Sequence, residues 1–299
     1  MTAIGDVTEK LNYLAQLVND ELEKFKKIEY TNVSGQKNVV DAMWYSLSAG
    51  GKRIRPVLVL EFCRICGGDY SSALSAACAI EMMHTFSLIH DDLPCVDNDD
   101  FRRGKPSCHK AYGEVNALLA GDALENRAFG IIAECGSLTD SQKVRLIKTL
   151  SDSTGVLGMI GGQVIDTECE NDPVTEELLL EMYGMKTGAL LSAACKMGCI
   201  CGSGTEQQLK FADDYGKNLG LAFQIVDDIL DVEGSAERFG KPIGSDAENG
   251  KTTFASLCGI ENAKKYAFEF SERALSALEA FSDVDFLKEL TMFLLRRDY

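Results

Sequence analysis

The scarcity of proline constrains this chain more than any other feature of its sequence. Only five prolines occur among 299 residues, at Pro56, Pro94, Pro106, Pro173 and Pro242. Because proline breaks helix interiors, long stretches are free to form uninterrupted helices. Between Ser71 and His90 the apolar residues recur at steps of three and four, which is the periodicity of a helix. No convincing hairpin signal separates alternating β-branched runs. The sequence therefore predicts an all-α fold.

Helix starts and breaks indicate how this fold is organised. Two capping boxes are present, at Thr139–Gln142 and Thr205–Gln208. Asp172-Pro173 offers an N-cap followed by proline at the first helical position. No segment has the length or low complexity of an interdomain linker, so we expect residues 1–299 to form a single domain of ten or more helices. A Gly-rich segment near Gly240–Lys251 is long enough to serve as a lid.

Composition and charge exclude several classes of protein. Hydrophobic content of 45% and charged content of 25% are typical of globular chains. A formal net charge of −16 argues against a nucleic-acid binder, which is expected to contain a basic domain. No apolar run approaches the roughly 18 residues of a membrane-spanning helix, and no secretory signal is visible. We expect a cytoplasmic protein without a membrane span, whose 11 cysteines are reduced thiols that pack as small hydrophobes.

The first of two acidic clusters spans residues 90–100 (HDDLPCVDNDD) and follows a strongly apolar helix. Pro94 disfavours helical geometry at the residue before it, so Asp91 and Asp92 are expected on the last helical turn. Asp97 would then return toward them from the bent segment. Carboxylates at a helix C-terminus are unfavourable unless a cation joins them. We therefore expect a cation site here rather than a solvated acidic loop.

The second acidic cluster, residues 223–231 (FQIVDDILD), has helical spacing. Asp227 and Asp231 are four positions apart, so they lie on one helix face, where like charges repel. Asp228 is the residue next to Asp227 in the sequence. Apolar neighbours draw these carboxylates toward the core, and buried carboxylates need protons, cationic side chains or metal ions. Hard oxygen ligands of this kind suit Mg²⁺, which usually shares its coordination shell with substrate phosphates.

Basic residues supply the other half of a site. In GGKRIRP (50–56), Pro56 is expected at the first position of a helix over 57–66, which sets Lys52 and Arg55 beside the anion-binding end of that helix. Three further lysines stand near interruptions in the helical pattern: Lys186, Lys241 and Lys251. Together the two sets of charges describe a cavity that binds two anions, one through Lys and Arg and one through Mg²⁺. A chain with a strongly negative net charge needs a locally positive site to hold a diphosphate, and divalent cations can provide that charge.

These motifs resemble those of the trans-isoprenyl diphosphate synthase family, in particular its bacterial-type short-chain branch of the farnesyl type. The matching segments, in the family's order, are GGKRIRP (50–56), HTFSLIHDDLPCVDNDDFRRGKP (84–106), LAGDAL (119–124), GGQVID (161–166), MKTGAL (185–190), FQIVDDILDVEG (223–234) and GKPIGSDAENGKTTF (240–254). They span most of the chain, and the combination of both acidic motifs with their companions is highly specific.

The resemblance implies antiparallel helices around a deep central cavity, usually in a homodimer, and it implies residue roles. The diphosphate of isopentenyl diphosphate would be bound by Lys52, Arg55, His84 and Arg103. The principal Mg²⁺ ligands would be Asp91, Asp97 and Asp227, within a set of motif carboxylates that also includes Asp92, Asp228 and Asp231. The allylic diphosphate would be neutralised by Arg102, Lys186, Lys241 and Lys251. Oxygens near the reacting carbon would come from Thr187 and Gln224, and the catalytic group would comprise Lys186, Thr187, Gln224 and Lys241. His90 fits a packed helix histidine as well as a site residue.

The implied chemistry needs no nucleophilic Ser or Cys. Metal ions and lysines stabilise the departing pyrophosphate, the double bond of isopentenyl diphosphate attacks the allylic cation, and a proton is lost. The product would grow along the helix that precedes Asp91. Phe86 lies five residues upstream, about 7.5 Å at the α-helical rise, where its ring could form the floor of the pocket. Ser87 is small and adds no block, so we expect the fifteen-carbon product, farnesyl diphosphate.

Three alternatives remain. A geranylgeranyl or geranyl diphosphate synthase would share the fold and differ in product length. A terpene cyclase also uses Asp-rich metal motifs, but it needs no isopentenyl site, so the GGKRIRP segment counts against it. A non-catalytic partner subunit of a heteromeric prenyltransferase commonly loses Asp-rich motifs, whereas both are intact here.

Overall fold

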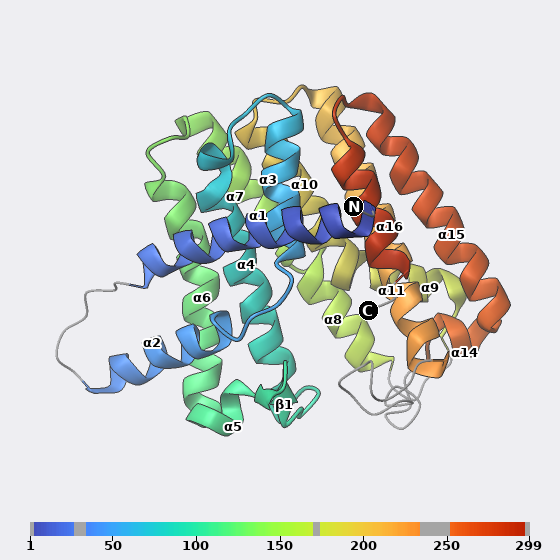
Figure 1. Ribbon diagram of the computed structural model, residues 1–299. Helices are drawn as coiled ribbons and strands as arrows, with labels where there is room; N and C mark the ends of the chain where they lie inside the picture. The colour runs from blue at the N-terminus through green and yellow to red at the C-terminus, as the bar shows by residue number, and fades with distance from the viewer. Residues whose placement is uncertain (1–2, 27–33, 170–173, 234–251, 297–299) are drawn as a thin grey trace.

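Helices make up nearly all of the structure, a computed structural model that describes residues 3–26, 34–169, 174–233 and 252–296 (Figure 1). The helical elements, in chain order, are α1 (Ala3–Phe25), α2 (Ser34–Leu47), α3 (Ile54–Ile65), α4 (Tyr70–Asp91), α5 (Cys108–Tyr112), α6 (Glu114–Glu134), α7 (Asp140–Thr154), α8 (Met159–Glu168), α9 (Glu176–Tyr183), the π-helical turn η1 (Gly184–Gly188), α10 (Ala189–Cys201), α11 (Glu206–Glu233), α14 (Phe254–Cys258), α15 (Ile260–Ala277), the 3₁₀ turn η2 (Leu278–Ala280) and α16 (Asp285–Arg296). The predicted all-α fold of ten or more helices is confirmed. The single-domain organisation stays a prediction.

Helices α3, α4 and α10 form the centre of the core because they are apolar around most of their circumference. Every residue from Pro56 to Cys63 in α3 is buried, and α10 is buried over nearly its whole length. A helix that is hydrophobic on all sides must be surrounded by other elements. Figure 1 shows how this is achieved, with α1 lying across the front of α3 and with α6 and α7 on the opposite side from α15.

The apolar character of α4 also has the length of a membrane-spanning segment. Among the described helices, only Tyr70–Asp91 is long and apolar enough to cross a membrane by length and composition, and 67% of its most apolar window is buried inside the protein. This burial is the pattern of a core helix. The expected cytoplasmic location stays a prediction.

The predicted helix starts agree with the structure in two places and differ in one, and a fourth is not tested. The boxes at Thr139 and Thr205 form, with the Gln142 and Gln208 backbone amides donating to the threonine hydroxyls. Asp172-Pro173 lies outside the described residues, and α9 begins at Glu176, where the Thr175 hydroxyl accepts from the backbone of the first turn. The prediction that Pro56 begins its helix is wrong: α3 starts at Ile54.

Pro56 is tolerated at the third position of α3 because amides in the first turn have no partner within the helix.

A second difference from the prediction is a small hairpin, β1 (Phe101–Arg102) and β2 (Lys105–Pro106), whose strands pair antiparallel. Arg103 and Gly104 both have positive φ at its turn, of 54° and 74°. Such a turn matches the twist of two strands, but it is most often signalled by Asn-Gly, and this sequence has Arg-Gly.

Three glycines allow two helices, α11 and α8, to approach α10 and η1 closely. A Cβ atom at Gly216 of α11 would lie 2.4 Å from the Ser192 Cα, and one at Gly220 would lie 2.5 Å from the Gly188 Cα. On the other side, a Cβ at Gly162 of α8 would lie 2.3 Å from the Lys186 backbone nitrogen. A larger residue at Gly162 or Gly220 would push the segment 184–188 away from its neighbours, and one at Gly216 would push α10 away from α11.

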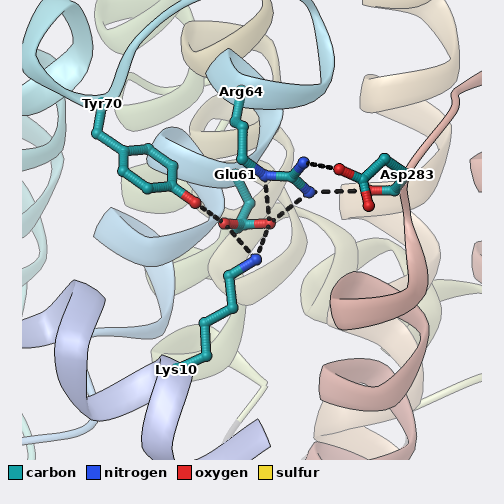
Figure 2. A network of polar contacts seen from close by, with 5 residues as sticks. All are labelled: Lys10, Glu61, Arg64, Tyr70 and Asp283. Carbon is teal, nitrogen blue, oxygen red and sulfur yellow. Dashed lines mark hydrogen bonds and ion pairs between the residues drawn. The ribbon is translucent and has the colours of Figure 1, made fainter. Parts of the chain in front are cut away.

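Two buried polar networks tie the outer helices to α3 and α4. The Glu61 carboxylate accepts from Lys10 Nζ at 3.0 Å and from the Tyr70 hydroxyl at 2.5 Å, and Arg64 bridges it to Asp283 (Figure 2). This network joins α1, α3, α4 and the segment before α16. Glu61 is fully buried, so its charge requires these partners.

The second network lies at the start of α3. Arg53, the N-cap residue with φ of 53°, donates to Glu81 of α4 at 2.5 Å, to the Asn19 side chain at 3.1 Å and to the Leu47 carbonyl at 2.6 Å. Both charged side chains are nearly inaccessible, at 3% and 2% exposed. Arg53 therefore fixes the segment 50–53 to three helices at once.

We expect Glu81→Ala to lower the free energy of unfolding by about 3–5 kcal/mol, because it leaves Arg53 as a buried charge without its carboxylate. Urea denaturation followed by circular dichroism measures the loss. Asp152→Ala, which breaks the exposed Lys148–Asp152 pair, is the control and should cost no more than about 1 kcal/mol. Equal losses for the two variants would contradict this account of the buried pair.

Candidate active site

The end of α4 is folded back on itself. The helix ends at Asp91, and the Asp97 backbone amide donates to the Asp91 carbonyl at 2.9 Å. Asn98, with φ of 52°, continues the turn by donating to the Leu93 carbonyl. The first acidic motif thus forms the bent segment that the sequence predicts, with Asp97 brought close to the helix end.

The two adjacent carboxylates of this motif have different surroundings. Asp92 is 2% exposed and accepts from Arg102 Nε at 2.9 and 3.2 Å, one contact to each oxygen. Arg102 also contacts Asp99 at 3.2 Å. Asp91, in contrast, lines a large cavity of which Asp92 is not a part. Arg102, predicted to neutralise an allylic diphosphate, is thus paired within its own motif, where it fixes the hairpin to α4.

The cavity beside Asp91 has a volume of 390 Å³ and combines polar and apolar walls. Its lining residues from α4 include His84, Phe86, Ser87 and Asp91, and the other walls contribute Arg55, Gln163, Lys186 and Thr187. Burial raises the pKa of Asp91 to about 6; Lys186 opposes the rise and the Asp97 charge adds to it. The site therefore holds negative charge at a position where burial makes that charge costly.

A positive region faces the same cavity from the start of α3. The Arg55 guanidinium lies 3.3 Å from His84 Nε2 and donates to it, so the His84 proton is on Nδ1. Burial, together with Arg55 and Arg103, holds the pKa of His84 well below its usual range. Burial lowers the pKa of Arg55 to about 10. His84 is thus neutral and Arg55 remains charged at physiological pH.

Two buried nitrogen atoms on the cavity wall have no hydrogen-bond partner among the described residues: Arg55 Nε and Gln163 Nε2. Buried donors are normally satisfied, so both indicate a ligand with acceptor oxygens. Gln163 belongs to the GGQVID motif, but no role was predicted for it from the sequence.

Arg103 and Lys52 lie near this region in different ways. Arg103 donates to the Gly50 carbonyl, and a Cβ at Gly51, whose φ is 120°, would lie 2.9 Å from its guanidinium carbon. Glycine at position 51 therefore permits Arg103 to lie over the segment before α3. The Lys52 ammonium lies 5.6 Å from the centre of the Phe293 ring on α16. Lys52 lines neither of the cavities described in this section.

A second, smaller cavity of 130 Å³ shares Lys186 and Thr187 with the first. Lys186 Nζ is paired with Asp166 of α8 at 2.5 Å, and the Thr187 hydroxyl donates to Gln224 Oε1 of α11 at 3.1 Å. Asp228 also lines this cavity. The predicted residues Lys186, Thr187 and Gln224 are thus brought together between the two acidic motifs.

The π-helical turn η1 explains how Lys186 and Thr187 reach both cavities. Single π-helical turns inside helices widen the backbone and occur frequently at functional sites. Here the turn spans Gly184–Gly188, between α9 and α10, and close packing at Gly162 and Gly220 holds it between α8 and α11. The sequence showed an interruption at MKTG, but not that the backbone stays helical through it.

The second acidic motif is only partly directed at the cavities. Asp228 Oδ2 accepts from the Tyr183 hydroxyl at 2.7 Å and from the Phe254 backbone amide at 2.8 Å, so this carboxylate anchors α14 and α9 to α11. Asp227 is half-buried and Asp231 is buried, and neither lines the two cavities. The loop lysines Lys241 and Lys251, with the predicted lid, lie outside the described residues.

The carboxylate oxygens at this site are suitable ligands for a metal ion that also binds a substrate. Within the described ranges, no group of three or more Cys, His, Asp or Glu side chains forms a metal cage. Mg²⁺ needs no such cage when it binds through one or two carboxylates together with phosphate oxygens. Asp91, whose charge is opposed by burial and by Asp97, is a hard oxygen ligand of the required kind.

Residues that sequence reasoning left without a role complete the site. Asp166 pairs with Lys186, Gln163 lines the larger cavity, and Tyr183 binds Asp228. The GGQVID motif contains two of them at a spacing of three, which sets both on one face of a helix and could have identified them.

Comparisons with known proteins agree with this geometry. Residues 36–291 match the family model described as polyprenyl synthetase. A farnesyl diphosphate synthase of Geobacillus stearothermophilus is 45% identical over 265 residues, covering 88% of each chain. A chloroplastic geranylgeranyl pyrophosphate synthase of Capsicum annuum is 43% identical over 276 residues, covering 91% of this chain and 75% of that protein.

Among solved structures, a geranylgeranyl pyrophosphate synthetase from Pyrococcus horikoshii superposes with a TM-score of 0.89 at 29% identity, covering 99% of this chain and 100% of that one. The family match covers most of the chain, and both relatives exceed 40% identity over most of its length. The chain therefore belongs to the polyprenyl synthetase family and is a prenyltransferase.

Proposed function

We propose that this prenyltransferase condenses isopentenyl diphosphate with dimethylallyl and then geranyl diphosphate, and that it releases farnesyl diphosphate. The supporting observation is a cavity that is lined by the charged residues Arg55, Asp91 and Lys186 and also by the apolar ring of Phe86. Such a cavity can hold the charged ends of two diphosphates at its polar walls and a hydrocarbon chain along its apolar depth. The names of its relatives, which include farnesyl and geranylgeranyl synthases, support the condensation without favouring either product.

Isopentenyl diphosphate would bind at the start of α3. Positive charge there comes from Arg103 and from Arg55, whose Nε has no hydrogen-bond partner within the described part of the chain. His84 is neutral because its pKa lies well below its usual range. Lys52 would turn from the Phe293 ring toward the diphosphate. Free amides at the N-terminus of α3 favour an anion at this position.

The allylic diphosphate would bind between the two acidic motifs. Its Mg²⁺ ions would be held by Asp91 and Asp97 on one side and Asp227 on the other, with Asp92, Asp228 and Asp231 supporting these ligands. When bound, the metal ions supply positive charge to the leaving pyrophosphate. Lys186 adds charge from between the cavities, helped by Arg102, Lys241 and Lys251.

The reacting carbon would then lie near Thr187 and Gln224. The allylic carbon–oxygen bond breaks and its electron pair leaves with pyrophosphate. The isopentenyl double bond forms the new carbon–carbon bond, and the proton lost from the adjacent carbon goes to the released pyrophosphate. The oxygens of Thr187 and Gln224, joined at 3.1 Å, orient toward positive charge at that carbon.

Product length is argued from the cavity itself, because a farnesyl and a geranylgeranyl synthase are almost equally similar to this chain. Phe86 is 6% exposed and lies on α4 five residues before Asp91. Its ring would stop a growing chain, while Ser87 leaves the neighbouring wall open.

A homodimer would cover the outer face of α6. Three large apolar side chains are exposed on this helix, with Val115 at 70% and Leu118 and Leu119 at 45% each. Contiguous exposed apolar side chains of this kind are typical of a surface that binds another subunit.

We expect the protein, incubated with Mg²⁺, isopentenyl diphosphate and dimethylallyl diphosphate, to release pyrophosphate and accumulate the fifteen-carbon product. Removal of divalent cations by a chelator should abolish turnover, and added Mg²⁺ should restore it, because the diphosphates would otherwise meet unneutralised carboxylates. Chromatography of the dephosphorylated products measures chain length. No release of pyrophosphate would favour a non-catalytic partner subunit, and a twenty-carbon product would favour the geranylgeranyl reading.

We expect Lys186→Met to lower kcat by about 10²–10³, since it removes preorganised charge from beside the leaving group. Lys196→Met is a matched control, because Lys196 lies on α10, pairs with Asp213 at 2.9 Å and is equally exposed, at 26% against 27% for Lys186. Steady-state assays compare the two variants. Similar losses of kcat in both would mean that Lys186 acts only in folding.

We expect Phe86→Ala to shift the product toward twenty carbons, because it removes the ring that closes the cavity. Ser87→Phe should shift it toward ten carbons, because it adds a ring to the open wall. Product ratios from the same incubation measure both effects. An unchanged ratio in Phe86→Ala would show that the floor of the cavity lies elsewhere.

A further inference from the structure

His90 occupies the last turn of α4, one turn beyond Phe86 and next to the first aspartate of the motif. The rings of Phe86 and His90 meet edge to face, with centres 4.8 Å apart and planes at 76°. Both residues line the 390 Å³ cavity. The Phe86 ring is therefore packed against a second aromatic ring.

The neighbouring helix α6 fixes the position of the His90 ring. His90 Nε2 lies 3.0 Å from the Leu118 carbonyl oxygen, and a carbonyl can only accept, so Nε2 holds the proton and donates it. The Asp122 carboxylate lies 3.7 Å from the same nitrogen. The ring is thus held by a backbone group, whose position does not depend on a rotamer.

Gly121 creates the space that the ring occupies. A Cβ atom at this position would lie 2.2 Å from His90 Nε2 and 2.4 Å from its Cδ2. No side chain heavier than hydrogen can coexist with the ring in its present position. Gly121 lies within the LAGDAL motif, so this contact gives that motif a physical reason for its glycine.

We propose that His90, held over Gly121 by the Leu118 carbonyl, is the positioning residue that fixes the Phe86 ring and so limits product length. This inference rests on the proposed function, in which Phe86 forms the floor of the cavity. His90 itself does not contact the reacting atoms. Its role is to prevent the Phe86 ring from swinging toward α6 when a growing chain presses on it.

The test compares product ratios of the full-length protein and four variants in the incubation with isopentenyl and dimethylallyl diphosphates. His90→Ala removes the packed ring, and Gly121→Ala displaces it from another helix without changing α4. The double variant combines both. Gly130→Ala is the matched control, since it makes the same change on α6 but meets only the flexible ends of two side chains, Arg127 at 3.3 Å and Glu134 at 3.9 Å. Circular dichroism checks that each variant is folded.

We expect His90→Ala and Gly121→Ala each to raise the ratio of twenty- to fifteen-carbon product by about three- to ten-fold, the effect of losing one aromatic pair. Gly130→Ala should keep the wild-type ratio. The double variant should equal His90→Ala, because a methyl group at position 121 has no ring to displace once the imidazole is gone. A change in kcat alone, with the product ratio unaltered, would assign His90 to the metal site or to folding and overturn the inference.

Phe86→Ala, measured alongside, separates this inference from the proposed function. If Phe86→Ala lengthens the product while both the His90 and Gly121 variants keep the wild-type ratio, the floor stands and the role of His90 is refuted. If Phe86→Ala leaves the ratio unchanged, the floor itself is wrong, and the role of His90 falls with it.

Discussion

The structure depends on keeping opposite charges near each other, around one cavity, without letting them cancel. Asp91 lies on one wall, Arg55 on another and Lys186 between the two cavities. Asp91 stays at the helix end and Arg55 contacts the neutral His84, so neither charge is cancelled by the other; Lys186 is already paired, but with Asp166 rather than with Asp91. If these charged side chains formed buried ion pairs with one another, the pairs would add little stability, because desolvation offsets their attraction. They would also leave no charge available to bind a ligand. A diphosphate with its cations can instead complete the set.

That arrangement requires helices to approach more closely than large side chains permit. The π-helical turn directs Lys186 and Thr187 at both cavities, and it fits only because α8 and α11 present Gly162 and Gly220 to it. Elsewhere the fold fixes the cavity walls with buried polar groups. Arg53 ties the segment before α3 to Glu81, and Asp228 ties α11 to Tyr183 and to the start of α14. The rigidity of the site therefore comes from the core beneath it.

The sequence predicted the helical class, two capping boxes and the bend after Asp91, because each follows from local rules of proline, threonine and glycine. The residue pattern alone could not separate Asp91 from Asp92, and only the family resemblance favoured Asp91. Adjacent residues with the same side chain differ only in what the fold brings opposite them; here Arg102 faces Asp92, and the larger cavity faces Asp91. The same holds for Asp227 and Asp228. The start of α3 was misjudged because proline is tolerated throughout the first helical turn. The hairpin was missed because its turn contains Arg103 at positive φ.

Helix α4 runs without interruption from Tyr70 to Asp91 and contains His84, Phe86 and Asp91. In a continuous α-helix each residue turns the chain by about 100° and advances it by about 1.5 Å. Inserting or deleting one residue between Phe86 and Asp91 would rotate one of them by about 100° relative to the other. Under the proposed function, the length of the hydrocarbon product would therefore change in small steps by exchanging side chains along this helix. Descendants of this gene that diverge in product should differ at the residues of α4, while its register stays invariant.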